Sequence, residues 1–167
     1  MKRVITIVAG LLLLGALANN ESIPVRASTP EHCITAPAHL AVQCFATQAA
    51  ALRVASGGRI QLAATQTAND LTNAQLFGGT SIQAILYQDE NYSGSSLTIY
   101  SSTCSGWNNM PAGWNDVVSS ARTSTCGVTL YELYNCNSGG MHLAVSPPGT
   151  PNVGPAMNDQ ASSWSLP

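Results

Sequence analysis

Apolar and polar residues alternate along the chain beyond residue 80, in the pattern of β-strands that bury one face. Two short alternating runs flank a glycine-containing turn in each half of this region. The apolar positions are Ile82, Ala84 and Leu86 with Leu97 and Ile99 in the first half, and Val128 and Leu130 with Leu143 and Val145 in the second. We predict an all-β domain at 81–167, in which two Greek-key motifs at about 81–123 and 127–167 form a sandwich.

Each turn of this pattern carries a glycine, Gly94 in the first half and Gly140 in the second. Glycine adopts a positive φ without the steric cost that a Cβ imposes. We therefore predict a folded-over hairpin in each half, with positive φ at both glycines.

Residues 19–80 show a different pattern. Apolar side chains at helical spacing predict an amphipathic helix over 41–56, at Val42, Phe45, Ala49, Leu52 and Ala55. Residues 59–63 alternate like a short strand, and residues 67–76 predict a second short helix. Because this region carries no recognisable chemistry, we interpret it as a linker at 19–32 followed by a small, mostly helical extension that packs on the β domain.

The N-terminus has the three parts of a secretory signal peptide. A basic start at Lys2 and Arg3 precedes an apolar run over 4–18, which closes on small residues. Cleavage is expected after Ala18, with Ala27 as a second possible end. A membrane anchor is the alternative, but the run is shorter than the roughly 20 residues that span a bilayer. We predict a secreted protein with no membrane association after cleavage.

Charge limits the classes of partner. Removal of residues 1–18 deletes Lys2 and Arg3, which leaves four arginines and no lysine against eight acidic residues. So few basic side chains do not neutralise a phosphate backbone or an anionic membrane surface. We therefore exclude nucleic acid and anionic lipid as partners.

Five cysteines in an exported chain favour disulfides over metal thiolates, because no Cys-x-x-Cys spacing occurs. Proximity suggests the pairs Cys33–Cys44 and Cys104–Cys126, which leaves Cys136 free or available for an intermolecular bond. A Cys104–Cys136 pair is the arrangement that would overturn this assignment.

A six-residue motif occurs twice, as Asn-Asp-x-x-Ser-Ser at 115–120 and again at 158–163. Each copy follows a tyrosine and glycine block, so the repeating unit is half a domain. Asparagine, aspartate and serine supply hard oxygen ligands, which calcium prefers. The alternative is that these are turn and strand-surface residues, but two copies in register favour metal.

The first half resembles the βγ-crystallin Greek key, in particular its microbial calcium-binding members. The resemblance rests on Tyr87-x-x-x-x-Tyr92-x-Gly94 followed by the motif at 115–120. The second half keeps Tyr131, Gly140 and the motif. It carries cysteine where the second aromatic residue is expected, and two extra residues before the glycine. The resemblance covers about residues 80–167 and implies a βγ-crystallin-like sandwich.

The resemblance also implies two calcium sites whose ligands the motifs share. Val117 (carbonyl) and Ser119 (hydroxyl) would bind one ion, and Gln160 and Ser162 the other. Across the motifs, the implied side-chain ligands or supporting residues are Asn115, Asp116, Asn158 and Asp159, and the implied carbonyl donors are Gln88 and Glu132. Which member of each Asn-Asp pair contacts the metal stays open. Few carboxylates imply dissociation constants on the order of 10⁻⁶ to 10⁻³ M.

No catalytic motif is present: the sequence has no His-Glu-x-x-His, no Gly-x-Ser-x-Gly and no phosphate-binding glycine loop. Our first hypothesis is a secreted, non-enzymatic calcium-binding βγ-crystallin-like protein. The second is a peptidase inhibitor, because the chain also resembles metalloproteinase inhibitors with one such domain. Its candidate loop is 102–113, although an ordinary inter-strand connection is favoured there.

The third hypothesis is a carbohydrate or cell-wall binding module. It rests on Trp107, Trp114 and Trp164 as a sugar-stacking platform. Trp114 and Trp164 stand beside the repeated motifs, so core packing is the favoured role for these two.

Overall fold

The computed structural model describes residues 31–37 and 42–167. The predicted signal peptide at 1–18 and nearly all of the predicted linker at 19–32 lie outside the described residues. Within the described part of the chain, none of the helices combines the length and the apolar character required to cross a membrane.

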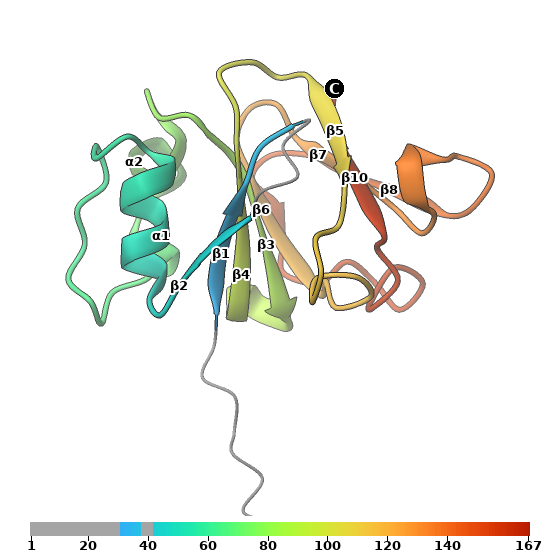
Figure 1. Ribbon diagram of the computed structural model, residues 1–167, viewed down its shortest axis with the longest axis horizontal. Helices are drawn as coiled ribbons and strands as arrows, with labels where there is room; N and C mark the ends of the chain where they lie inside the picture. Colours follow the sequence, from blue (N-terminus) through green and yellow to red (C-terminus); the bar gives the residue numbers. More distant parts are fainter. Residues whose placement is uncertain (1–30, 38–41) are drawn as a thin grey trace, which may run out of the picture.

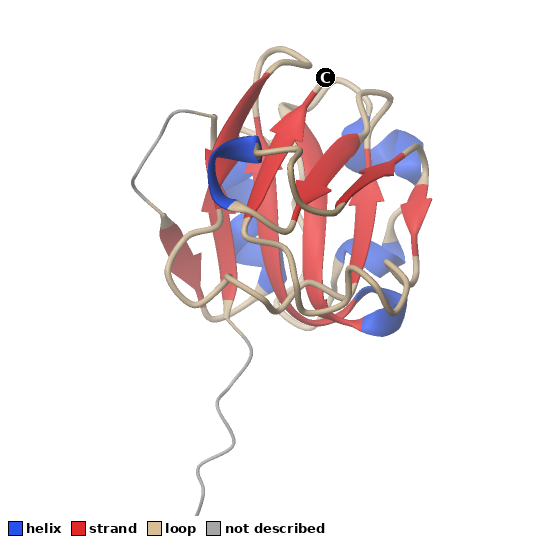
Figure 2. Ribbon diagram, turned by 90° about the vertical axis from the view of Figure 1, so that its right-hand side faces the viewer, coloured by secondary structure: helices blue, strands red, loops and turns tan. Residues whose placement is uncertain are grey.

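Two β-sheets form the body of the protein, with a small helical region at one side (Figure 1). The larger sheet has the order β2-β1-β4-β3-β6-β9. Its strands are β1 (His32–Thr35), β2 (Gln43–Phe45), β3 (Ile82–Asp89), β4 (Ser93–Tyr100), β6 (Ser120–Thr123) and β9 (Gly149–Thr150). The smaller sheet has the order β5-β10-β7-β8, formed by β5 (Gly106–Asn109), β7 (Val128–Tyr131), β8 (His142–Val145) and β10 (Ser163–Leu166). Figure 2 turns the side of the smaller sheet toward the viewer.

Each sheet contains strands from both halves of the predicted repeat. β5 of the first half pairs with β10 of the second, and β9 of the second half pairs with β6 of the first. This exchange joins the halves by backbone hydrogen bonds. The predicted all-β, two-sheet sandwich with a small helical N-terminal region is confirmed.

A single apolar core fills the space between the two sheets, and the alternating positions of the sequence supply most of it. The buried residues of this core include Ala84, Leu86, Leu97, Ile99, Val128, Leu130 and Val145. Trp114 and Trp164 are 4% and 0% exposed and belong to the same core. Their predicted role in packing is therefore confirmed.

The helical region covers the outer face of the larger sheet (Figure 1). α1 (Gln48–Ala55) and α2 (Asn73–Phe77) place Leu52 and Leu76 in a second apolar cluster with Ile85 and Tyr87 of β3. The region preceding residue 81 also contributes strands, because β1 lies beside β4 in parallel. It is thus part of the sandwich as well as a cover for it.

The helix predicted over 41–56 is wrong in its first half. α1 begins at Gln48, where the Thr47 side chain accepts a hydrogen bond from the backbone N–H of Ala50, and Gln43–Phe45 forms β2 instead. β2 pairs with β1 so that Cys33 lies opposite Cys44, and a disulfide joins the two. A cross-strand covalent bond of this kind fixes the segment as a strand despite its helical apolar spacing.

The segment after α1 also differs from the prediction. Residues 59–63 form no strand, and the Ser56 hydroxyl accepts a hydrogen bond from the buried N–H of Ile60. The predicted helix over 67–76 is divided into a 3-10 turn at Ala68–Asp70 and α2. Thr67 and Thr72 each form a capping box, and two helix starts five residues apart interrupt one continuous helix.

Tyr87 gives the fold a dependence on alkaline pH. It is 1% exposed, and burial raises the pKa of its hydroxyl to about 12. An unfolded tyrosine loses its proton near a pH of about 10, so stability is complete below that pH and is lost as pH rises toward the folded pKa. At pH 11 we expect a loss of about 1.4 kcal/mol in the free energy of unfolding, which Tyr87→Phe abolishes.

Urea unfolding at pH 8 and pH 11 measures this difference. Tyr134→Phe is the matched control, because Tyr134 is 52% exposed. Equal losses in the wild type and in Tyr87→Phe would show that another group causes the alkaline destabilisation.

Candidate metal centre

The two copies of the repeated motif lie against each other and are related by an approximate twofold symmetry. The backbone N–H of Asp116 donates to the carbonyl of Ala161 over 3.1 Å, and the N–H of Asp159 donates to the carbonyl of Val118 over 3.2 Å. Both aspartates have positive φ, 58° and 55°. Each aspartate of one motif is therefore fixed beside the residues that precede the serine of the other.

The same symmetry governs the first serine of each motif. The N–H of Ser119 donates to the carbonyl of Tyr87 over 2.9 Å, and the N–H of Ser162 donates to the carbonyl of Tyr131 over 2.7 Å. Both serines are 6% exposed. Gln88 and Glu132 follow these tyrosines directly, so each lies near the serine of its own half, whereas the resemblance implied carbonyl donors from the opposite motif.

One carboxylate lies across the seam from a serine hydroxyl. Ser162 Oγ donates to Asp116 Oδ1 over 3.5 Å, which joins the two motifs by side chains. Within each Asn-Asp pair the asparagine amide donates to the neighbouring carboxylate: Asn115 to Asp116, and Asn158 to Asp159 over 2.8 Å. The asparagines therefore orient the aspartates.

The aspartate of one motif lies near the first serine of the other at two equivalent places, Asp116 with Ser162 and Asp159 with Ser119, which we call the two corners. Both corners offer oxygen atoms of the types that suit a hard cation. Each corner combines one exposed aspartate, one buried serine hydroxyl and nearby backbone carbonyls of Val117 or Gln160. The Asn115 Oδ1 atom is buried and has no hydrogen-bond partner. A buried acceptor without a donor costs free energy, and a bound cation or its water would satisfy it.

Glu132 is held on its hairpin by two hydrogen bonds to the backbone of Met141. Its Oε2 accepts a hydrogen bond from the N–H of Met141 over 2.8 Å, and its own N–H donates to the Met141 carbonyl. These bonds hold the side chain on the hairpin. The backbone carbonyl, which is the predicted donor, is not used in these two bonds.

Sequence reasoning missed the role of the last serine in each motif. Ser120 Oγ donates to the carbonyl of Asp89 over 2.7 Å and accepts from the N–H of Tyr92 over 3.0 Å. Ser163 Oγ donates to the carbonyl of Leu133 over 2.6 Å and accepts from the N–H of Cys136 over 2.9 Å. Each serine thus holds the folded hairpin of its own half. The sequence signal for this role was that serine occupies the last position of the motif in both copies.

The two hairpins keep the same backbone shape despite their different sequences. The 3-10 turns Glu90–Tyr92 and Tyr134–Cys136 each end in two residues of positive φ. Cys136 therefore occupies the backbone position of Tyr92. Gly94 has the predicted positive φ of 75°, but the prediction for Gly140 is wrong. A Cβ there would lie 2.8 Å from Leu133 Cγ, so close packing is what requires that glycine.

Both proposed disulfides are present, Cys33–Cys44 and Cys104–Cys126. Cys136 is the free cysteine, and its thiol donates to the carbonyl of Trp164 over 3.2 Å. Burial raises the pKa of the Cys136 thiol, which favours its protonated form at neutral pH.

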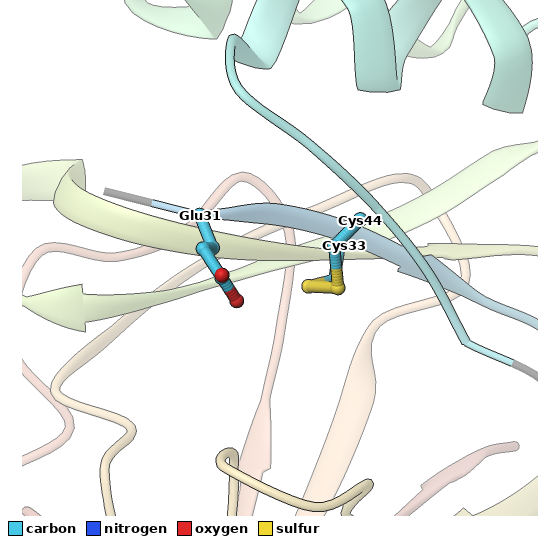
Figure 3. A group of neighbouring side chains, drawn as sticks. All are labelled: Glu31, Cys33 and Cys44. Atoms are coloured by element: carbon cyan, nitrogen blue, oxygen red, sulfur yellow. A yellow bond between two sulfur atoms is a disulfide. The ribbon is translucent and has the colours of Figure 1, made fainter. Parts of the chain in front are cut away.

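A second group of potential ligands lies near the N-terminus of the described chain. Glu31, Cys33 and Cys44 place one carboxylate and two sulfurs within 4.8 Å of one another. Figure 3 shows that the two sulfurs are bonded to each other. Because thiolate is the form that ligates metals, a disulfide removes both ligands and excludes this group as a metal centre.

The candidate inhibitor loop at 102–113 is not one free loop. Residues 106–109 form β5, which pairs with β10, and Met110 is 6% exposed. Trp107 is the exposed large hydrophobic side chain of this segment, at 50% exposure. The segment is therefore partly a strand of the smaller sheet, and not only the inter-strand connection that the sequence favoured.

Comparison with known proteins gives similarities in fold. No protein-family model and no curated protein matches this chain. A βγ-crystallin domain from Clostridium beijerinckii is 23% identical, and the match covers 50% of this chain and 97% of that chain with a TM-score of 0.42. A βγ-crystallin from an archaeon is 21% identical over 53% of this chain and 100% of that one, with a TM-score of 0.44.

A βγ-crystallin from Ciona intestinalis is 22% identical over 51% of this chain and 99% of that chain, with a TM-score of 0.43. The two sheets define a mostly β sandwich, and βγ-crystallin domains are among its structural neighbours.

Proposed function

We propose that this protein is a secreted, non-enzymatic calcium-binding protein in which two ions bind at the seam between the halves and stabilise the sandwich. The observation that carries the proposal is the contact between Ser162 Oγ and Asp116 Oδ1 across the seam. It brings a carboxylate of one motif to the hydroxyl of the other. The two disulfides suit an oxidising, extracellular environment.

Each proposed ion takes ligands from both motifs. The first site consists of the Asp116 carboxylate, the Ser162 hydroxyl and the backbone carbonyls of Gln160 and Glu132. The second consists of their symmetry counterparts, namely the carboxylate of Asp159, the hydroxyl of Ser119 and the carbonyls of Val117 and Gln88. Asn115 and Asn158 hold the carboxylates in place through the amide hydrogen bonds described above.

This ligand set predicts moderate affinity. Calcium takes six to eight oxygens, so water completes each shell, and one carboxylate per site supplies little charge. Because each ion bridges the halves, it binds the folded state and not the unfolded chain. For a dissociation constant on the order of 10⁻⁴ M, 1 mM calcium adds about 1.4 kcal/mol per site to the free energy of unfolding.

Calcium is therefore expected to raise the melting temperature by roughly 5–10 °C at 1 mM, relative to the protein in EDTA. Differential scanning calorimetry measures the shift, with magnesium chloride at equal ionic strength as the salt control. Ser119→Ala and Ser162→Ala should each remove about half of the shift. Ser146→Ala, at an exposed serine, should leave it unchanged. A wild type that melts at the same temperature with and without calcium would refute the proposal.

A further inference from the structure

The smaller sheet presents an outer face that the helical region does not cover. Trp164 and Leu166 of β10 point into the core, at 0% and 4% exposure, so Ser165 between them points outward. The strand register places one outward row across all four strands, formed by Trp107, Ser165, Thr129 and Ala144. In Figure 2, where this side of the protein faces the viewer, α1 and α2 lie behind the sheets.

The two sheets differ in the chemistry of their outer faces. The larger sheet presents Ile34, Ile85 and Tyr87, which are all buried beneath the helical region. Tyr131 is the counterpart of Tyr87 in the second half, and it is only partly buried. A face rich in isoleucine requires a permanent cover, whereas a face of hydroxyl, small and partly exposed aromatic side chains remains stable in water. The smaller sheet therefore has a face that is suited to reversible contact.

Aromatic rings on this face are held in defined positions. The Tyr131 and His142 rings stack with centroids 5.9 Å apart and an interplanar angle of 25°. Tyr131 Oη hydrogen-bonds Ser165 Oγ over 3.2 Å, which fixes the tyrosine ring. Trp107 lies two strands and two residues away from Tyr131 in the register, a Cα separation of about 12 Å for regular strand geometry.

The charge of the face restricts its occupant. We define the open face as Trp107, Thr129, Tyr131, His142, Ala144 and Ser165. It contains no acidic side chain, no lysine and no arginine, so it has nothing to pair with a polyanion or a polycation. Its polar groups are hydroxyls and one imidazole, which match the hydroxyls of an uncharged partner. Its rings match apolar C–H faces.

We propose that the open face binds a neutral, extended polysaccharide. Sugar rings stack on Trp107 and on the Tyr131–His142 pair, and the hydroxyls of Ser165 and Thr129 between them bond to sugar hydroxyls. A sheet face with aromatic groups about 12 Å apart fits a ribbon-like chain that spans several rings. This site is separate from the calcium sites, which lie at the seam between the motifs.

The test is retention of the purified protein on microcrystalline cellulose and on chitin, with starch and alginate as comparison polymers. The expected result is retention on cellulose or chitin and none on starch or alginate. Trp107→Ala should weaken retention at least tenfold, as is typical of a central aromatic contact. Trp107→Phe should keep more of it than Trp107→Ala. Val54→Ala is the control, because Val54 is an exposed apolar residue on α1.

Retention on the polysaccharide should persist in EDTA at a temperature where the protein remains folded. The polysaccharide proposal can therefore hold even if the protein does not bind calcium. Lack of retention on both cellulose and chitin would overturn the proposal. Equal retention of Trp107→Ala and the wild type would overturn it as well. Sedimentation velocity tests for self-association. If the wild type is a dimer and Trp107→Ala is a monomer, the open face binds a second copy of the chain and not a polysaccharide.

Discussion

Arg122→Met is expected to lower the free energy of unfolding by about 3–4 kcal/mol. Arg122 lies on β6 and is 8% exposed. One guanidinium nitrogen donates to the carbonyl of Ala68 over 2.6 Å, and another donates to the carbonyl of Leu71 over 3.2 Å and to the Asn73 side chain. These acceptors belong to the helical region, so Arg122 binds that region to the larger sheet.

The physical reason for so large an effect is the loss of several charge-assisted hydrogen bonds at once. Methionine fills a similar length but donates nothing, which leaves the carbonyls of Ala68 and Leu71 without this donor. Each hydrogen bond to a charged group contributes about 1.5–3 kcal/mol. The Arg122 guanidinium also lies 6.0 Å from the centre of the Tyr92 ring, a contact that the variant loses.

Urea unfolding at pH 7 measures the change. Arg53→Met is the matched control, because Arg53 is exposed on α1 and should change stability by no more than about 0.5 kcal/mol. Limited proteolysis of Arg122→Met should cut first within 56–81, where the helical region loses its attachment. If Arg122→Met lowers the free energy of unfolding by less than about 1 kcal/mol, apolar packing alone holds the helical region on the larger sheet.

The second large effect is expected for the last serine of each motif. Ser120→Ala and Ser163→Ala should each cost about 2–4 kcal/mol of unfolding free energy, measured in EDTA. Each serine is 0% exposed and makes two hydrogen bonds to the backbone of its hairpin. Alanine leaves a donor and an acceptor of that backbone without their partner.

The neighbouring serine gives a matched comparison. Ser119→Ala should reduce the calcium-induced rise in melting temperature but cost no more than about 1 kcal/mol in EDTA. Ser120→Ala should lower stability in EDTA and keep most of the calcium effect. If both variants behave alike in EDTA, the hairpin hydrogen bonds do not have the separate structural role that the geometry indicates.

The fold was predictable as far as it depends on local pattern. The alternation of apolar residues identified the two motifs and most of the core, and the proximity of the cysteines gave both disulfide pairs. The helix over 41–56 was too long because Val42 and Phe45 fit helical spacing, whereas the pairing of β2 with β1 depends on a disulfide across the sheet. Periodicity within one segment contains no information about such a partner.

The candidate site was predictable to the same extent. The duplicated motif singled out Ser119 and Ser162, and the structure places each beside the hairpin tyrosine of its own half instead of the opposite half that the resemblance implied. The sequence did not distinguish Asn115 from Asp116, because both offer an oxygen ligand. In the folded chain the Asn115 amide donates to Asp116 and Asp116 contacts Ser162, while the buried Oδ1 atom of Asn115 has no hydrogen-bond partner.

The sequence by itself determined the two-motif β sandwich, the repeated oxygen-rich corners and the half-buried pattern of the strands, because these follow from residues close together in the chain. Only the tertiary structure decided that β1 lies parallel to β4, that Arg122 binds the helical region to the larger sheet, and that Trp107 stands on the sheet that the helical region does not cover. Those features depend on which surfaces meet when the whole chain is compact. Burial of apolar area selects that arrangement from many that local pattern permits.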